Sequence, residues 1–107
     1  MPGFLANFDA LKAKGVDTIA CISVNDAFVM GAWGKDLKVG DKIMMMGDGN
    51  AEFTQAMGLP LDASRNGLGT RSQRYAMIVD NGVIKELFVE KPGAFDVSSA
   101  ENVLKHL

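Results

Sequence analysis

A nearly continuous apolar run, VDTIACISV at residues 16–24, constrains the fold of this chain more than any other feature. The run is rich in β-branched residues and does not alternate between apolar and polar side chains. Such a run is typical of a strand covered on both faces, as in sheets flanked by helices. It therefore predicts an α/β fold with helices on both sides of a mixed sheet.

The remaining segments supply the other elements of such a fold. An apolar stripe with helical spacing marks the first segment and comprises Phe4, Leu5, Phe8 and Leu11. The expected order is a helix over 2–14, the strand at 16–24, a helix over 27–38, a strand over 42–48, a short helix over 51–58, a long loop over 59–73, a β-hairpin over 74–90 and a helix over 99–107.

Turn and capping signals mark the ends of several elements. An Asn-Gly pair at 81–82 separates two β-rich runs, and this is one of the strongest hairpin signals. Asn25 or Asp26 is suited to cap the helix that follows the first strand. Either residue is also placed where α/β proteins bind ligands, although we favour capping. Asp96, Ser98 or Ser99 is suited to start the last helix, and Ser98 with Glu101 has the spacing of a capping box.

Length and charge exclude several classes of partner. The 107 residues match the size of one domain, so we expect a single domain over residues 1–107. The net charge of −2 argues against nucleic acid as a partner, because phosphate binding needs a basic face. No apolar stretch reaches the roughly 18–20 residues that a membrane span needs, and we expect the N-terminus not to be a secretory signal, because it lacks a charged lead before an apolar core. We therefore expect neither nucleic acid nor a membrane as partner.

The metal and redox chemistry of the chain is limited by its one cysteine and one histidine. Cys21 alone forms neither an intramolecular disulfide nor a zinc cluster, and His106 is most simply a cation at a helix end. Met44, Met45 and Met46 are read as strand core in preference to a copper site. We expect no metal and no cofactor. A lone thiol is typical of a reducing compartment, here the cytoplasm.

Whether Cys21 is a nucleophile or a structural residue is the central functional question. A reactive thiol needs a lowered pKa and some exposure, which a helix N-terminus or a neighbouring cation provides. Cys21 instead lies between Ala20 and Ile22, with no lysine or arginine close in sequence. Burial in such surroundings raises the pKa of a thiol. We favour the structural interpretation, while the catalytic one stays open.

Two long strings, SVNDAFVMGAW at residues 23–33 and RYAMIVDNGVIKELFVE at residues 74–90, resemble the type II peroxiredoxins, and the resemblance runs from Pro2 to Leu107. It implies a thioredoxin-like fold and reduction of hydroperoxides through a cysteine, in antioxidant defence. In that family the peroxidatic cysteine lies in a Pro-x-x-x-Thr-x-x-Cys loop at the start of a helix. The opening PGFLANFDALKAKG looks like the later part of that helix. We therefore expect the chain to be N-terminally truncated and inactive by itself.

The resemblance assigns a role to Arg74, the first residue of the second string. The family arginine at this position stabilises the thiolate and polarises the peroxide. From the residues alone, a solvated arginine at a strand end is the simpler interpretation; Arg71 is a weaker second candidate. Val97 stands in the loop where some family members have a resolving cysteine. An external thiol, glutathione or glutaredoxin, is therefore the expected reductant.

A non-catalytic association module is the alternative function. Phe28, Met30 and Trp33 are read as core or, by resemblance, as part of a region near a homodimer contact, together with the loop at 59–73. The resemblance also places a strand between the segments at 18–24 and 74–80. Without it, we expect those two strands either to pair directly or to leave edges that favour self-association.

Overall fold

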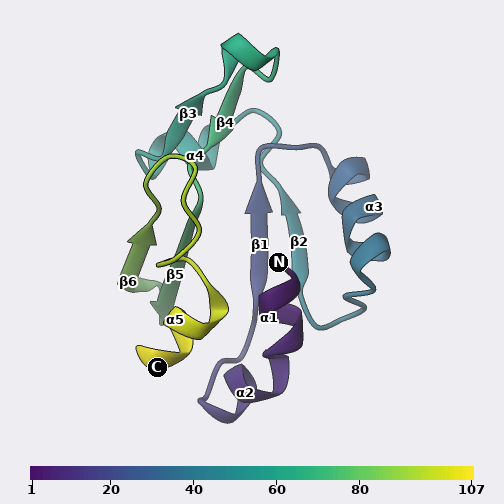
Figure 1. The fold of residues 1–107 in the computed structure, drawn as a ribbon. Coiled ribbons are helices and arrows are strands. Elements are labelled where there is room, and N and C mark those ends of the chain that lie inside the picture. Colours follow the sequence, from purple (N-terminus) through teal and green to yellow (C-terminus); the bar gives the residue numbers. More distant parts are fainter. The chain divides into compact units, whose positions relative to one another are not determined.

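The structure, a computed structural model, describes all residues 1–107 and contains two compact units. The terminal unit comprises Met1–Asp17 and Gln73–Leu107, and the central unit comprises Thr18–Ser72. Helices and strands alternate along the chain (Figure 1), so the predicted α/β class is confirmed. The strands form three two-stranded sheets, each within one unit.

A parallel β-α-β arrangement forms the base of the central unit. β1 (Ala20–Ser23) pairs with β2 (Met44–Gly47), and α3 (Ala27–Leu37) connects them (Figure 1). Parallel neighbours need such a crossover because the chain must return to the same end of the sheet. β1 is shorter than the apolar run that predicted it. Within it Cys21 is half-buried, while Ile19 and Val24 on either side of the strand are buried.

The helix α3 shows how a glycine decides which face packs. Asp26 caps it by accepting a hydrogen bond from the Val29 amide at 2.8 Å, as predicted. The buried residues of α3 are Met30 and Gly34, whereas Phe28 is 89% exposed. A Cβ at Gly34 would lie 3.1 Å from Cγ of Met45, so the missing side chain lets α3 approach β2 closely. Of the residues read as core or as part of a dimer-contact region, Met30 is therefore in the core and Phe28 is not.

A carboxylate organises the turn after β2. Asp48 accepts hydrogen bonds from the Phe53 amide at 3.1 Å, the Thr54 amide at 2.8 Å and the Thr54 hydroxyl at 2.7 Å. These bonds satisfy the first turn of α4 (Glu52–Ala56), the short helix that the sequence predicts. The Thr54 hydroxyl hydrogen bond lowers the pKa of the Asp48 carboxyl most strongly, although partial desolvation opposes this effect.

The segment expected to be a long loop contains a hairpin, so that prediction was wrong. β3 (Pro60–Asp62) and β4 (Thr70–Ser72) pair antiparallel, and the 3₁₀ turn η1 (Ser64–Asn66) lies between them. Each strand has three residues, too few to show a period of two in the sequence. The Asp62 carboxylate accepts a hydrogen bond from the Ser64 amide at 3.0 Å and fixes the start of the turn.

Three short helices belong to the terminal unit. The predicted N-terminal helix is divided into α1 (Pro2–Ala6) and α2 (Phe8–Ala13) at Asn7, whose side chain donates to the Gly3 carbonyl at 2.8 Å. The last helix, α5 (Ala100–Lys105), is capped by Ser99, which accepts from the Asn102 amide at 3.2 Å. Ser99 is one of the three predicted starts, whereas the capping box predicted at Ser98 and Glu101 was wrong.

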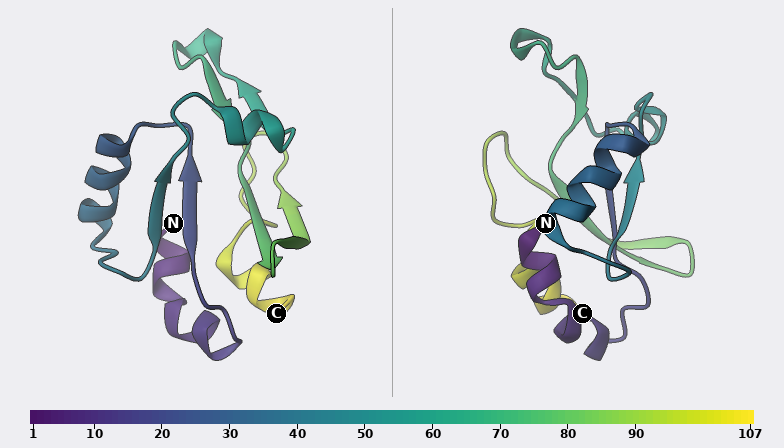
Figure 2. Two further views of the ribbon diagram at one scale, coloured as in Figure 1. Left: turned by 180° about the vertical axis from the view of Figure 1, so that it is seen from behind. Right: turned by 90° about the vertical axis from the view of Figure 1, so that its right-hand side faces the viewer.

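The second hairpin confirms its turn signal. β5 (Tyr75–Asp80) and β6 (Val83–Val89) run antiparallel and lie side by side in both views of Figure 2. Asn81 and Gly82 have φ angles of 52° and 78°, the left-handed values that a two-residue primed turn requires. The strong local signal thus produced the predicted structure.

Candidate functional site

Arg74 lies immediately before β5, at the point where the second hairpin begins. Its backbone carbonyl accepts a hydrogen bond from the Glu90 amide at 2.9 Å, so the two ends of the hairpin are tied together. The residue is exposed, and Cζ of its guanidinium lies 5.2 Å from the centre of the Phe95 ring. The structure therefore places an accessible, permanent positive charge at the start of a paired strand.

Glu90 is the buried polar centre of this region, with only 6% of its surface exposed. One carboxylate oxygen, Oε2, accepts three hydrogen bonds: from the Asp96 amide at 2.6 Å, the Ser98 amide at 2.9 Å and the Ser98 hydroxyl at 2.7 Å. We call this group of bonds the Glu90 clasp. It fixes the connection between β6 and α5 to the end of the hairpin.

The clasp also determines the charge of Glu90. Burial by itself would raise the pKa of the Glu90 carboxyl. Hydrogen bonds from Ser98, Asp96 and Val97 outweigh this effect and lower the pKa to about 2. Glu90 is therefore ionised at neutral pH and gives the loop a charge-assisted anchor.

Phe95 stands out because most of it faces solvent. The side chain is 62% exposed, and it belongs to the residue next to Asp96, the first amide held by the clasp. Sequence analysis missed both Glu90 and Phe95. A glutamate directly after an apolar strand was the only sequence signal for Glu90, and Phe95 carried none.

Arg71 has a different environment from Arg74. Its Nη1 donates to the Val24 carbonyl at 2.6 Å and to Oδ1 of Asn25 at 3.0 Å, and its Nε donates to the Leu68 carbonyl at 2.9 Å. These bonds join β4 to the segment that follows β1. The structure thus places Arg71 in a structural role. Asn25 shares that role, because its side-chain oxygen accepts one of these hydrogen bonds.

Cys21 lies inside β1, with Met45 as its register partner on β2. The thiol is half-buried, and its loss of solvation raises the pKa of Cys21 above its ordinary value. A thiol with a raised pKa is a poor nucleophile at neutral pH. These observations agree with a structural role.

The other candidate residues do not converge on a catalytic group. Met44 and Met46 are 54% and 43% exposed, while Met45 packs against α3. His106 ends α5, where its Nδ1 lies 2.8 Å from the Asn102 carbonyl. No group of three histidine, cysteine, aspartate or glutamate side chains is placed to hold a metal ion.

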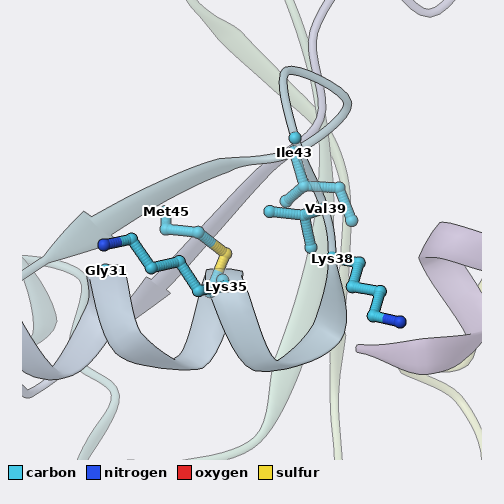
Figure 3. Close-up of a pocket in the computed structure, with 8 residues that line it drawn as sticks. Gly31, Lys35, Lys38, Val39, Ile43 and Met45 are labelled. Atoms are coloured by element: carbon cyan, nitrogen blue, oxygen red, sulfur yellow. The ribbon is translucent and has the colours of Figure 1, made fainter.

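A shallow pocket of about 330 Å³ lies between α3 and β2 of the central unit. Figure 3 shows Val39, Ile43 and Met45 at its apolar centre, while the Lys35 and Lys38 side chains extend to opposite sides. Their ammonium groups therefore do not converge on one point. None of the candidate catalytic residues lines this pocket.

The central unit also exposes large apolar side chains. Phe28 and Val29 at the start of α3 are 89% and 47% exposed, and Leu61 and Leu68 of the first hairpin are 42% and 50% exposed. None of the helices has the length and apolar character required to cross a lipid bilayer.

Comparison with known proteins gives a consistent result. Residues 1–104 match the Redoxin family. The chain is 54% identical over 109 residues to the chloroplastic peroxiredoxin-2E of Arabidopsis thaliana, covering 100% of this chain and 47% of that protein. It is 47% identical to peroxiredoxin-2D of the same plant, covering 100% of this chain and 66% of the relative.

A solved structure is similar over the same span. Reduced Prx3 of Vibrio vulnificus in complex with H2O2 superposes with a TM-score of 0.93 at 55% identity, covering 99% of this chain and 68% of that one. The thioredoxin-like fold expected from the resemblance is thereby confirmed. The chain spans about half to two thirds of the length of these relatives.

Proposed function

This chain belongs to the Redoxin family, with type II peroxiredoxins as its relatives, and we propose that it serves in the thiol-dependent reduction of hydroperoxides, with Arg74 holding the peroxide. The observation that carries the proposal is the exposed guanidinium of Arg74 at the start of β5. The relative from Vibrio vulnificus is described in complex with H2O2, which supports this substrate class.

The chemistry of a guanidinium suits this role. In the proposed reaction a thiolate attacks the distal oxygen of ROOH, the O–O bond breaks, and the thiolate becomes a sulfenic acid while RO⁻ leaves and takes a proton. Negative charge moves onto the leaving oxygen during this step. A fixed cation with several N–H donors in one plane stabilises that charge, and it remains protonated at any working pH.

The thiolate of this reaction is not assigned to Cys21. The 107 residues contain no Pro-x-x-x-Thr-x-x-Cys sequence, and Cys21 is half-buried with a raised pKa. We therefore propose that the 107-residue chain by itself has negligible peroxidase activity. Peroxide consumption with glutathione and glutaredoxin is expected to be equal for the chain and its Cys21→Ser variant. Turnover that Cys21→Ser abolishes would contradict this proposal.

A fusion protein tests the role of Arg74. The part of Vibrio vulnificus Prx3 that precedes the matched region is joined to Met1, since the two chains are 55% identical over that region. The fusion is expected to reduce H2O2, and Arg74→Gln is expected to remove most of that activity. Arg65→Gln is the matched control because Arg65 is also exposed. Full activity of Arg74→Gln would overturn the proposed function.

The reductant and the compartment are further parts of the proposal. Val97 occupies the loop before α5 where a resolving cysteine would otherwise stand, so the sulfenic acid is proposed to be reduced by an external thiol. Glutathione with glutaredoxin is the proposed reductant, and a thioredoxin-only assay of the fusion is the comparison.

The cytoplasm is the proposed compartment. One relative is chloroplastic by name, so imaging of the tagged protein is the direct test.

Homodimer formation is proposed on a separate observation, the 89% exposure of Phe28. Phe28 lies next to Val29, which is 47% exposed, and adjoining exposed apolar side chains are typical of an interaction surface. The same surface would serve an association module without catalysis, the second candidate function. Sedimentation is expected to show a dimer at micromolar concentration that Phe28→Ser weakens. Val83→Ser is the control because Val83 is 60% exposed in the terminal unit. If the unaltered chain sediments as a monomer, as Phe28→Ser does, dimer formation is contradicted.

A further inference from the structure

We propose that Phe95 is a positioning residue for Arg74: the Glu90 clasp holds the loop that carries Phe95, and the face of its ring holds the guanidinium in place. The proposal rests on the peroxide-binding role of Arg74 and adds the group that orients it. Phe95 itself need not contact the peroxide.

Three contacts within the terminal unit connect Arg74, Glu90 and the segment that carries Phe95. The Glu90 amide donates to the Arg74 carbonyl at 2.9 Å, which fixes the backbone of the arginine. The Glu90 carboxylate binds the Asp96 amide at 2.6 Å, which fixes the backbone next to Phe95. The Phe95 ring centre then lies 5.2 Å from Cζ of Arg74. One buried residue thus sets the positions of both partners in the contact.

The distance is short enough for an attractive interaction. Cations within about 6 Å of a ring centre are drawn to the negative face of the π system. Arginine has a long side chain with many rotamers, so even a modest attraction restricts it. At an exposed site we expect the contact to raise the population of the held rotamer about two- to fivefold.

A ring is a suitable support for an arginine that must bind a substrate. Hydrogen bonds to carbonyl groups would use the N–H donors of the guanidinium, as they do at Arg71. A contact with an aromatic face offers no lone pair, so donors in the guanidinium plane remain available to a peroxide oxygen. Phe95 is also 62% exposed, so core packing does not account for its place in the loop.

Nuclear magnetic resonance of the 107-residue chain tests the contact without any need for turnover. In the unaltered chain, nuclear Overhauser effects are expected between the Phe95 ring protons and the δ and ε protons of Arg74. Those protons should also show an upfield ring-current shift. Phe95→Leu is expected to remove the shift and to increase the motion of Arg74 Nε. Phe95→Tyr is expected to retain both properties, because it keeps the ring.

A second cation–ring pair provides the matched control. Nζ of Lys12 lies 5.6 Å from the Phe8 ring centre in the same unit. Phe8→Leu is expected to shift Lys12 and to leave the Arg74 side chain unchanged. A structural disturbance alone would move Arg74 in both leucine variants.

Two results would overturn the proposal: absence of the Arg74–Phe95 Overhauser effects in the unaltered chain, or unchanged Arg74 shifts and Nε relaxation in Phe95→Leu. The first result is decisive even if a variant folds poorly. Neither depends on peroxide reduction. Loss of the proposed function would instead appear as full activity of Arg74→Gln in the fusion protein, so the two failures are distinguishable.

Discussion

Arg71 and Arg74 lie three residues apart, one at the end of the central unit and the other at the start of the hairpin in the terminal unit. Arg71 donates to two backbone carbonyls and one amide side chain, so its guanidinium stabilises the folded structure. Arg74 is exposed and lies over an aromatic ring. The same type of side chain therefore has a structural role at Arg71 and is available to a ligand at Arg74. The groups that surround each guanidinium determine this difference.

The difference shows how an arginine is kept available for chemistry. A guanidinium that satisfies carbonyl oxygens stabilises the native state, and the N–H donors used in this way are no longer available to a ligand. A guanidinium supported by a ring is held more weakly, and its donors stay open. The comparison predicts that substitutions at the two positions separate activity from stability.

The largest expected effect is on catalysis by the Vibrio fusion protein. Arg74→Gln should lower kcat/KM for H2O2 by about 10²- to 10³-fold, the usual loss when one preorganised donor to a developing anion is removed. Steady-state peroxide assays measure this change. Arg74→Lys should recover only part of the activity, because an ammonium lacks the planar donor set. An unchanged rate in both variants would remove the distinction between the two arginines.

The next effect is on the stability of the 107-residue chain. Arg71→Ala should lower the free energy of unfolding by about 2–3 kcal/mol, because the Val24 carbonyl and the Asn25 side chain lose a charged donor. Urea unfolding followed by circular dichroism measures it. Arg74→Ala is the paired variant and should change stability by less than about 0.5 kcal/mol. Equal losses at both positions would break the comparison.

The Glu90 clasp predicts a pH dependence in the terminal unit. The pKa of Glu90 is lowered from 4.5 to about 2, so its contribution is fully present above about pH 4.5 and is lost as the pH falls toward 2. Glu90→Gln should be less stable than the unaltered chain at pH 7, and the gap should narrow at acid pH. Urea midpoints between pH 7 and pH 2 measure this effect. A gap independent of pH would contradict the clasp.

The smallest effect tests the structural role of Cys21 in the central unit. Cys21 should react with iodoacetamide at pH 7 about tenfold more slowly than a free cysteine peptide, because burial raises its pKa and limits access. Mass spectrometry of the alkylated chain follows the rate. Addition of urea should restore the peptide rate. Fast stoichiometric labelling of the native chain would make Cys21 a candidate nucleophile again.

Features that depend on neighbours in the chain could be predicted from the sequence. The Asn81-Gly82 turn formed because two successive residues with positive φ favour one tight hairpin. Asp26 caps α3 because its carboxylate reaches an amide three residues on. The two long strings also indicated the family. The turn and the cap are satisfied by partners within a few residues, so their formation does not depend on distant segments.

Only the tertiary structure decided the contacts between distant segments. Gly34 packs closely against β2, where a Cβ would lie 3.1 Å from Cγ of Met45, and no local pattern contains that information. Glu90 is ionised in a buried site because amides from the next loop reach it. Arg74 and Phe95 likewise come into contact only in the folded chain. Secondary-structure propensity depends on residues that are near in sequence. The burial of a residue, the ionisation of a carboxyl and the availability of a guanidinium depend on the groups that folding places beside them.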